Sequence, residues 1–545
     1  MIPKPVYVSR WLCVWLAVTA AAPLLLTQGS ARAEESEPRE GLFTAPDADW
    51  LSMQSQATDT SLIPGFYQTS EFMVGRVAVG LILPESDGTL DPNQSDWTIE
   101  QRQQVLNEVT AGLNWWSQQS PQAHLTFVID DHATTPIATG YEPILHPQSE
   151  EGLWISDVLS RLGYSSGSYW TRVRTYVNDL RETYDTDWAF AIFVANSRGD
   201  ADAAFADHYF AYAYVGGPLM VMTYDNAGYG IVNMDAVTAH ETGHIFRALD
   251  QYGSAGTACT TRSGYLGVET QNSQRPGCAS DVPSIMRGGI YPYTVHALDP
   301  YAAGQIGWRD SDGDGLYDPI DTIPTLTVDS TDHVGDVWSY TGHAADTAFP
   351  SPLRPSATIN AVVVEYRIDS GEWAQAQPAD GVFDSPEEGF TLTLDLAASG
   401  NHHVTLRTRN SADNVSDMAE FTAVVPDPID GGLDTYLDQR AAAQPDHASP
   451  QIISGEATSF NADGTPGATL ARVEYRIDGG EWHAARPVDD AFDSTEEVFV
   501  IPLAVGGGTH LIEARAIDVN GKVEQNAASA QLTIDYRTFL PLVQK

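Results

Sequence analysis

The stretch HETGHIFRALD, residues 240–250, places His240 and His244 four positions apart, with Glu241 beside the first histidine. Residues i and i+4 of a helix lie about one turn apart on one face, so both imidazoles can reach a single ion. Glu241, about 100° round the helix, is placed to act as a general base on a water molecule. The stretch therefore predicts a helix that binds zinc in a hydrolytic site.

A catalytic zinc needs a third protein ligand and one open coordination position. Asp250 lies ten residues after His240 and is the first candidate for that ligand. Glu269 and Asp235 are the alternatives.

The spacing of His240, His244 and Asp250 follows the extended pattern HExxHxxGxxH/D and resembles that of the metzincins, a group of zinc endopeptidases. The aspartate version is similar to small snapalysin-type secreted peptidases, and HETGHIF with LDQY resembles immunoglobulin-A-degrading-type peptidases. In PSIMRGG, Met286 stands 42 residues after His244, in a setting similar to the methionine turn of astacins and matrix metalloproteinases. The resemblance covers residues 71–309 and implies an α/β zincin fold, zinc on the three ligands and cleavage of peptide bonds.

Arg247 departs from this pattern, which has glycine at that position. Glycine permits a left-handed turn, so an arginine either costs about 1 kcal/mol or sends the chain along another path to Asp250. Tyr252, Tyr291 and Tyr293 are candidates to stabilise an oxyanion, although packing is the more common role of a tyrosine.

Strand and helix patterns alternate before this stretch, as an α/β layer fold requires. Apolar strands are expected at residues 73–85, 123–131, 188–196, 210–217 and 218–226. Amphipathic helices are expected at residues 96–119, with Asp96 as a cap, at 168–184 and at 230–249, with Asn233 or Asp235 as a cap.

An internal repeat follows, in which VEYRIDSGEW from Val364 returns as VEYRIDGGEW from Val473, a shift of 109 residues. Short alternating strands with dense turn signals predict two β-sandwiches. They resemble the immunoglobulin-like or fibronectin-like modules of many secreted bacterial enzymes. We expect Trp373 and Trp482 to pack within the copies rather than bind ligands, and His403 and His510 to occupy nearly equivalent places.

The N-terminal 33 residues read as a secretory signal peptide, with Lys4 and Arg10 before an apolar run and Ala-Arg-Ala at residues 31–33. An uncleaved membrane anchor is the alternative, but the run is shorter than the roughly 20 residues of a spanning helix. Residues 34–70 form a linker or a propeptide. They contain no cysteine to cap the zinc, although an acid such as Asp47 or Asp59 is suited to that role.

Cys259 and Cys278 are the cysteines left after the signal, and we expect them to form a disulfide, with metal ligation as the alternative. The net charge of -45 argues against nucleic acids and anionic membrane surfaces as partners. We expect a secreted, extracellular monomer, free or associated with the cell surface, without a membrane span once the signal is cleaved.

DSDGDGLYDPID at residues 310–321 has the spacing of an EF-hand-type calcium loop. The expected Ca²⁺ ligands are the carboxylates of Asp310, Asp312, Asp314, Asp318 and Asp321 and the backbone carbonyl of Leu316. A solvated acidic linker is the alternative.

The sequence thus predicts a multidomain protein in which an α/β, metzincin-like peptidase domain precedes two all-β sandwiches. The expected segments are a signal (1–33), a linker or propeptide (34–70), the peptidase domain (71–309), a calcium hinge (310–324), a sandwich (325–425), a linker (426–446), a second sandwich (447–536) and a tail (537–545). The expected function is secreted, zinc-dependent endopeptidase activity on proteins or peptides. The alternative is an inactive extracellular adhesin or scaffold that binds through its sandwiches.

Overall fold

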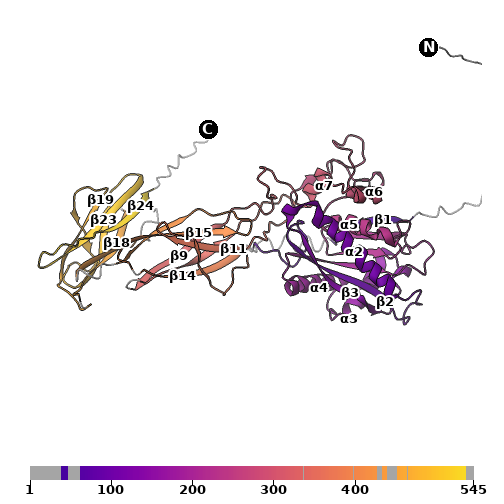
Figure 1. Ribbon diagram of the computed structural model, residues 1–545, viewed down its shortest axis with the longest axis horizontal. Helices are drawn as coiled ribbons and strands as arrows, with labels where there is room; N and C mark the ends of the chain where they lie inside the picture. The colour runs from indigo at the N-terminus through magenta and orange to yellow at the C-terminus, as the bar shows by residue number, and fades with distance from the viewer. Residues whose placement is uncertain are drawn as a thin grey trace, which may run out of the picture.

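The computed structural model describes residues 38–46, 62–334, 337–396, 398–425, 432–438, 451–462 and 464–534. The predicted signal peptide, Asp47, Asp59 and the C-terminal tail lie outside these residues. Figure 1 shows an elongated multidomain molecule, with an α/β domain at one end and two β-sandwiches following in line. Among the described residues, no helix is long and apolar enough to cross a bilayer.

The α/β domain is built on a six-stranded sheet with the order β1-β5-β6-β4-β2-β3. Its strands are β1 (Arg39–Phe43), β2 (Arg76–Ser86), β3 (Thr126–Thr139), β4 (Trp188–Ala195), β5 (Tyr209–Tyr214) and β6 (Leu219–Thr223). β2, β3, β4 and β6 pair in parallel, β5 is antiparallel to β6, and β1 is parallel to β5. β1 lies within the segment expected to be a linker or propeptide.

Helices cover both faces of this sheet. α2 (Ile99–Gln119) and α5 (Met234–Ile245) share one hydrophobic core, and α3 (Glu151–Arg161) and α4 (Tyr169–Tyr184) share the other. α3 was not predicted. The Thr98 side chain caps α2 instead of Asp96, because its hydroxyl accepts from the Gln101 amide in a reciprocal capping box, whereas Asp96 accepts from Asn93.

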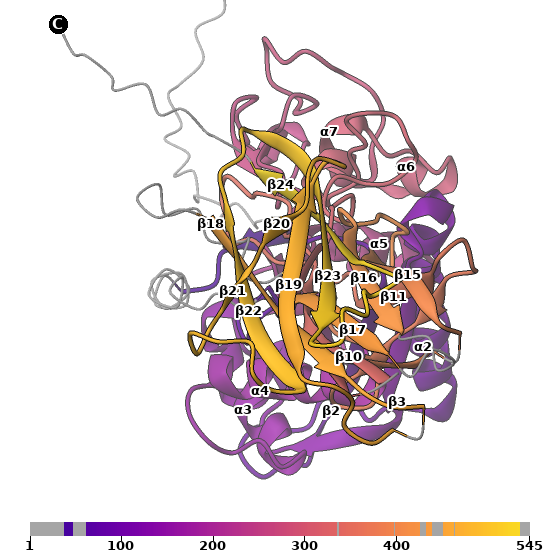
Figure 2. The ribbon, with the colours of Figure 1, turned by 90° about the vertical axis from the view of Figure 1, so that its left-hand side faces the viewer.

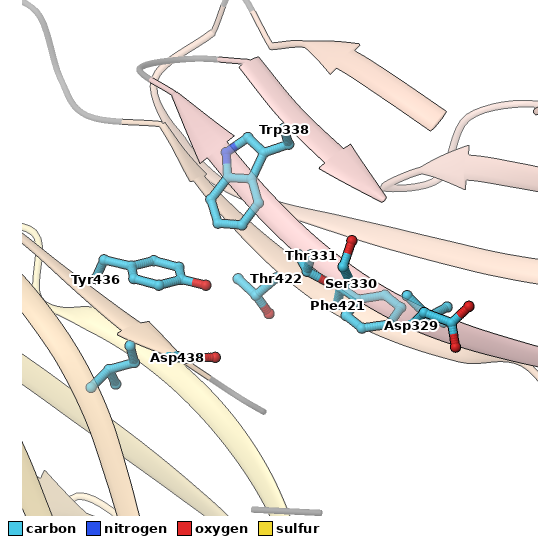
Figure 3. Close-up of a pocket in the computed structure, with 10 residues that line it drawn as sticks. Asp329, Ser330, Thr331, Trp338, Phe421, Thr422, Tyr436 and Asp438 are labelled. Atoms are coloured by element: carbon cyan, nitrogen blue, oxygen red, sulfur yellow. The ribbon is translucent and has the colours of Figure 1, made fainter. Parts of the chain in front are cut away.

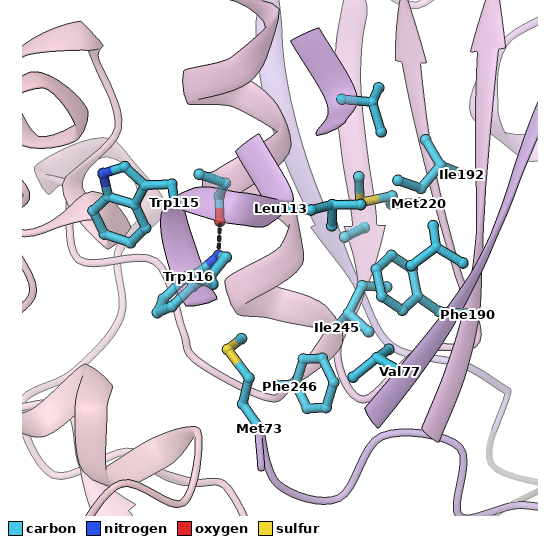
Figure 4. Packing of buried hydrophobic residues seen from close by; sticks show 14 of the residues in the cluster. Met73, Val77, Leu113, Trp115, Trp116, Phe190, Ile192, Met220, Ile245 and Phe246 are labelled. Atoms are coloured by element: carbon cyan, nitrogen blue, oxygen red, sulfur yellow. Dashed lines mark hydrogen bonds between the residues drawn. The ribbon is translucent and has the colours of Figure 1, made fainter. Parts of the chain in front are cut away.

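The contact between α2 and α5 fixes the helix that carries the histidines (Figure 4). Trp116 is fully buried, and its indole Nε1 donates to the Ala239 carbonyl at 2.8 Å. A Cβ on Gly112 would come within 2.5 Å of the Asp235 carbonyl oxygen, so the two helices approach as closely as their backbones permit. The helix that carries the two histidines is therefore closely packed against α2.

The segment after α5 contains short elements, namely β7 (Arg262–Ser263), β8 (Val268–Glu269), α6 (Ile290–Thr294) and α7 (Pro300–Gln305). Cys259 and Cys278 form a disulfide in this segment, as predicted.

The first sandwich stacks the sheet β13-β14-β10-β9 on the sheet β12-β11-β15-β16. Its strands are β9 (Thr325–Val334), β10 (Val337–Ala345), β11 (Val362–Ile368), β12 (Ala374–Gln375), β13 (Gln377–Pro378), β14 (Glu387–Asp395), β15 (Gly400–Asn410) and β16 (Ala419–Val425). Its core is formed by inward-facing side chains of both sheets, including Trp338 and Phe390.

The second sandwich repeats this plan with the sheets β17-β18-β22-β21 and β20-β19-β23-β24. Its strands are β17 (Leu433–Asp438), β18 (Gln451–Ser459), β19 (Leu470–Ile477), β20 (His483–Ala484), β21 (Arg486–Pro487), β22 (Glu496–Leu503), β23 (Gly508–Asp518) and β24 (Ala528–Ile534). Figure 2 looks along the molecule from this end, with β19 and β23 in front of the first sandwich. β17 lies within the predicted linker, where the alternation of Leu433, Thr435 and Leu437 supplies its buried face.

The two copies share specific side-chain arrangements. Trp373 lies under the guanidinium of Arg407 at 3.9 Å, and Trp482 lies under that of Arg515 at 4.0 Å, which supports packing as the role of both tryptophans. The structural equivalent of His510 is His402 instead of His403. Both His510 and His402 bind an aspartate through Nδ1 and a backbone carbonyl through Nε2, whereas His403 faces Glu420.

A cavity of about 370 Å³ lies between the sandwiches (Figure 3). Trp338, His333 and Tyr436 gather beside it, with Trp338 stacked on His333 at a centroid distance of 4.7 Å. Because Trp338 is only 1 % exposed, it belongs to the sandwich core and offers no open ring face.

Candidate metal centre

Three donor atoms meet at the end of α5. The Nε2 atoms of His240 and His244 lie 3.1 Å apart, and Asp250 Oδ1 lies 3.2 Å from each of them. All three residues are buried. Ligand atoms held about 2.0 to 2.1 Å from a tetrahedral zinc would be about 3.3 Å apart, so this triangle has the size of one face of a zinc coordination shell. The three residues form a site that could hold a metal ion.

Backbone carbonyls orient both imidazoles. His240 Nδ1 lies 2.8 Å from the Ile285 carbonyl oxygen, and His244 Nδ1 lies 2.7 Å from that of Ala248. A carbonyl only accepts, so each Nδ1 carries a hydrogen, and each Nε2 faces the common point as the nitrogen that would bind an ion. The two Nε2 atoms lie 3.1 Å apart, which brings both within reach of one cation.

The chain turns sharply after the helix to present Asp250. α5 ends at Ile245, and Arg247 adopts the left-handed conformation with a φ of 75°. Arg247 therefore makes the same left-handed turn that glycine usually makes at this position. The chain reaches Asp250 by this turn and not by another path. Gly216 makes room for it, since a Cβ there would come within 2.3 Å of the Arg247 Cζ.

A buried ion triad holds the Arg247 side chain in this conformation. Its Nη2 lies 3.3 Å from Glu71 Oε1, and Arg354 of the first sandwich binds the same carboxylate through Nε at 3.0 Å and Nη2 at 2.8 Å. Glu71 is fully buried; burial raises its pKa, but Arg247 and Arg354 lower it to about 2. The carboxylate is therefore charged. It links the segment from Phe246 to Asp250, called the metal loop below, to the first sandwich.

Met286 packs against α5 at the helix turn that carries the second histidine. A Cβ on Gly243 would come within 2.5 Å of the Met286 Sδ, so the methionine packs directly on α5. The Gln251 amide donates to the Met286 carbonyl at 2.8 Å, next to Asp250. The turn at residues 285–287 thus contacts two parts of the site. Its Ile285 carbonyl binds His240, and its Met286 carbonyl binds the residue that follows Asp250.

The Glu241 carboxylate is buried close to the charges of His240, Glu40 and Asp250. Among the described residues, neither of its buried carboxylate oxygens has a hydrogen-bond partner. Burial raises the pKa of Glu241 well above its usual value, and Glu40 and Asp250 add to this rise. Burial lowers the pKa of His240, but Glu40 and Asp250 outweigh it and raise that pKa to about 10. So many buried carboxylates favour a positive charge at this point, which a divalent cation would supply.

A cavity of about 740 Å³ opens beside Asp250. β1 borders it, together with Tyr209, Tyr229, Tyr252 and the glycine turn after Met286. Of the predicted tyrosines, Tyr252 donates to Asp250 Oδ2 at 3.1 Å. Tyr291 is 64 % exposed, and Tyr293 stacks on Trp115, so neither lines the cavity.

The alternative third ligands lie elsewhere. Glu269 binds Arg262 at 3.3 Å, and its carboxylate is partly exposed in the disulfide-bounded loop. Asp235 sits in the first turn of α5, where its Oδ1 accepts from the Ala236 amide. Asp250 is the carboxylate that the fold brings to both histidines.

The acidic loop brings together half of its predicted ligands. Carboxylate oxygens of Asp310, Asp312 and Asp314 lie within 4.8 Å of one another. Asp318 instead binds Arg309 Nε at 2.6 Å, and Asp321 accepts from the Asn414 Nδ2 of the first sandwich at 2.9 Å. Leu316 donates its amide to Asp314.

Glu40, Glu71 and Tyr229 are site residues that the sequence patterns did not reveal. The Tyr229 hydroxyl accepts from the Gly289 amide at 3.1 Å, and it also hydrogen-bonds to Glu40. The one signal available was the acidic character of the segment before residue 70.

The chain matches no family model and no curated protein. Solved structures that match parts of it include three examples. The fibronectin(III)-like modules of CbhA from Clostridium thermocellum are 14% identical and match 39% of this chain and 94% of that chain, with a TM-score of 0.15. The D00-D0 domain of intimin is 14% identical and matches 39% of this chain and 100% of that chain, with a TM-score of 0.14. The sulfane dehydrogenase SoxCD from Paracoccus pantotrophus is 22% identical and matches 20% of this chain and 25% of that chain, with a TM-score of 0.14. The chain spans only a quarter of the length of the dehydrogenase. TM-scores this low carry no argument about activity.

Proposed function

We propose that this protein is a secreted, zinc-dependent endopeptidase of metzincin-like design. The observation that carries the proposal is the buried triangle of His240, His244 and Asp250, with the unpartnered Glu241 carboxylate beside it. Two imidazole nitrogens and one carboxylate oxygen form a donor set that suits zinc. The disulfide between Cys259 and Cys278 favours an oxidising, extracellular compartment.

Each residue then has a defined part in hydrolysis. Bound zinc supplies Lewis-acid chemistry, which polarises the peptide carbonyl and lowers the pKa of water. Glu241 takes the proton from the attacking water and passes it to the nitrogen of the leaving amine, so that protons balance over the reaction. Tyr229 and Tyr252 line the cavity beside the site, and their hydroxyls are candidates to stabilise the negative charge that develops on the carbonyl oxygen.

A peptide substrate is favoured over other hydrolysable substrates by what lies in the cleft. β1, an extended polypeptide segment, pairs with β5 beside the metal site and lines the cavity. A cleft that accepts an extended strand by backbone pairing suits a polypeptide.

The Glu241→Gln variant tests this function. Glutamine keeps the size of the side chain but accepts no proton, so hydrolysis of a peptide or casein substrate should fall at least about a hundredfold. Zinc content, measured by atomic emission, should stay at one ion per chain. The exposed Glu182→Gln on α4 is the matched control and should keep full activity.

Equal activity of Glu241→Gln and the parent would overturn the proposed mechanism. The alternative, an inactive adhesin or scaffold, predicts no hydrolysis by either protein, and none after zinc is added to chelator-treated protein. Removal of zinc should abolish the activity of the parent, and its return should restore it.

We also propose a structural calcium ion on the loop at residues 310–321. Asp310 already bends this loop, because it accepts from the Gly313 amide at 2.6 Å and the Gly315 amide at 3.0 Å. The clustered carboxylates of Asp310, Asp312 and Asp314 repel one another and would gain from a cation.

Calcium should protect this loop from proteolysis. At a hundredfold excess over its dissociation constant, calcium would stabilise the bound state by about 2.7 kcal/mol. Limited digestion, followed by mass spectrometry, should therefore cut near residue 315 faster in a calcium-selective chelator. Asp312→Ala should be cut at the fast rate under both conditions. Identical digestion of the parent with and without calcium would reduce the loop to a solvated linker.

A further inference from the structure

The residue before Asp250 is held by the C-terminal end of α7. The Leu249 amide donates to Gln305 Oε1 at 3.0 Å. Gln305 is fully buried, and its Nε2 donates to the Val268 carbonyl at 3.2 Å and to Thr270 Oγ1 at 3.0 Å. Because a buried polar group that loses its partner is costly, this side chain can neither turn over nor move aside.

The residue after Asp250 is held by the other end of the same helix. Gln251 is fully buried, and its Nε2 donates to Asp299 Oδ2 at 2.8 Å. Asp299 Oδ1 caps α7, since it accepts from the amides of Tyr301 at 2.9 Å and Ala302 at 3.2 Å. One buried carboxylate therefore fixes both the start of α7 and the residue next to the third donor.

The loop that the disulfide closes adds two bonds to Gln251. Asn272 Nδ2 donates to Gln251 Oε1 at 2.8 Å, and the Gln274 amide donates to the Gln251 carbonyl at 2.7 Å. The Asn272 bond also fixes which end of the Gln251 side chain faces Asp299. Because Oε1 receives a donor, Nε2 is the group left to bind the carboxylate.

The position of the Asp250 carboxylate depends on this backbone. Its Oδ1 lies 3.2 Å from the Nε2 atoms of His240 and His244, and its Oδ2 accepts from the Tyr252 hydroxyl at 3.1 Å. An aspartate side chain is short, so a shift of residues 249–251 would carry Oδ1 away from the two nitrogens. Metal sites need their ligands held within about 0.5 Å of the productive geometry.

We infer that Asp299 and Gln305, at the two ends of α7, are positioning residues that set how tightly the metal centre holds zinc. They hold the residues on either side of Asp250, so that the third donor stays within reach of the ion. The inference rests on the proposed zinc site and assigns its retention of metal to a helix outside the zinc-binding stretch. Loss of either bond should lower zinc affinity about tenfold to a hundredfold, although every ligand is still present.

An exchange of donor and acceptor tests the Asp299 end in the full-length protein. Asp299→Asn keeps the oxygen that caps α7 but sets two amide groups against each other, and Gln251→Glu sets two carboxylates against each other. The double variant restores one donor and one acceptor, while Asn272 can still donate to the introduced glutamate. Zinc affinity, measured by competition with a chromogenic chelator, should fall about tenfold or more in each single variant. In the double variant it should return to within about threefold of the parent.

Gln305→Met tests the other end, because methionine has a similar shape but offers no acceptor to the Leu249 amide. Zinc affinity should again fall about tenfold or more. Tyr176→Phe is the matched control, since it also removes a buried hydrogen bond, to Asp130 Oδ2 at 2.8 Å, but in the core on the other face of the sheet. It should leave zinc affinity unchanged.

Thermal unfolding of the zinc-free proteins separates positioning from a general loss of stability. A purely structural role would lower the Tm of the zinc-free variants and leave the zinc affinity of the folded protein at the parental value, which would overturn the inference. A double variant that binds zinc no better than the single variants would also contradict it for Asp299. A parent that binds no zinc would refute the proposed function as well. The expected pattern of zinc affinities without peptide hydrolysis by the parent would support the inference and refute the peptidase function.

Discussion

The two sandwiches share a fold and differ in how they meet the rest of the molecule. In the first, the connection from β10 to β11 runs from residue 346 to 361 and reaches the α/β domain. Arg354 in this connection binds Glu71, and the Tyr265 hydroxyl donates to the Phe349 carbonyl at 2.7 Å. In the second, the corresponding connection from β18 to β19 runs only from residue 460 to 469. There, Asn461 bonds to Thr465 within the loop itself.

Features that occur in both sandwiches belong to their common fold, and features that occur in one of them can form its contact with the α/β domain. The repeated strands and the tryptophan under two arginines occur in both copies, so they encode the fold. The longer connection occurs in one copy, and through Arg354 and Glu71 it reaches Arg247 in the metal loop. The first sandwich is therefore part of the support of the metal site, whereas the second copy has no counterpart of this contact among the described residues.

The largest effect should come from Arg354→Ala. Removal of one partner from a buried ion triad leaves Glu71 undercompensated and should cost about 3 kcal/mol of stability in the α/β domain. Because Arg247 then loses part of its support, zinc should also pass to a chelator faster. Thermal unfolding and zinc release would measure the two effects.

Asn461→Ala in the second sandwich is the matched control, and it should leave zinc release unchanged. If both variants released zinc at the same rate, the contact through Arg354 would have no bearing on the metal site.

An intermediate effect should appear when pH is varied, with opposite signs in the two regions. Glu524 is buried in the second sandwich at the place where the first has Ser416. Burial raises its pKa to about 8, despite hydrogen bonds from Thr435 and Ala516 that lower it. The folded state then binds the proton more tightly than the unfolded state, so stability is highest below about pH 4.3 and falls as pH rises toward 8.

Glu71 should respond in the opposite direction, since its folded pKa of about 2 is lower than that of the unfolded chain. Its contribution is present above about pH 4.3 and disappears as pH falls toward 2. Hydrogen exchange at pH 3, 5 and 8 can follow β17 and the metal loop separately. Glu524→Gln should flatten the profile of β17 alone, and a slope that persists in this variant would contradict the assignment.

The smallest effect should come from the two tryptophans that the copies share. Trp373→Leu and Trp482→Leu each remove a ring stacked under arginines, and each should lower the Tm of its own sandwich by about 5 °C. The two shifts should be equal within error, because the surroundings are the same. A much larger shift in one copy would show that its tryptophan does more than pack.

Local patterns predicted a large part of this molecule. The spacing of His240, Glu241 and His244 is a property of one helix. The repeat that begins at Val364 and Val473 is a direct match between two segments of the sequence. The α/β order before α5 was also predicted, because buried strands such as β4 are continuously apolar. The multidomain fold class is confirmed.

The rest depends on contacts between distant parts of the chain. Glu71 and Arg354 are 283 positions apart, so no periodicity links them. β1 is a short strand with the sequence REGLF, and its polar residues gave no strand pattern from which its pairing with β5 could be predicted. The cap of α2 shows the same limit on a smaller scale, because Asp96 and Thr98 are both good caps and only the geometry of the turn selects Thr98.

The pairing of β1 with β5 also bears on how the protein behaves at high concentration. An uncovered edge strand offers unpaired amides and carbonyls to other chains and can template intermolecular sheets. While β1 is in place, that aromatic edge, from Tyr209 to Tyr214, is hidden. A chain shortened to lack β1 would expose this edge, and repulsion between these strongly acidic molecules would then oppose association, so the shortened chain should aggregate more readily as salt is added.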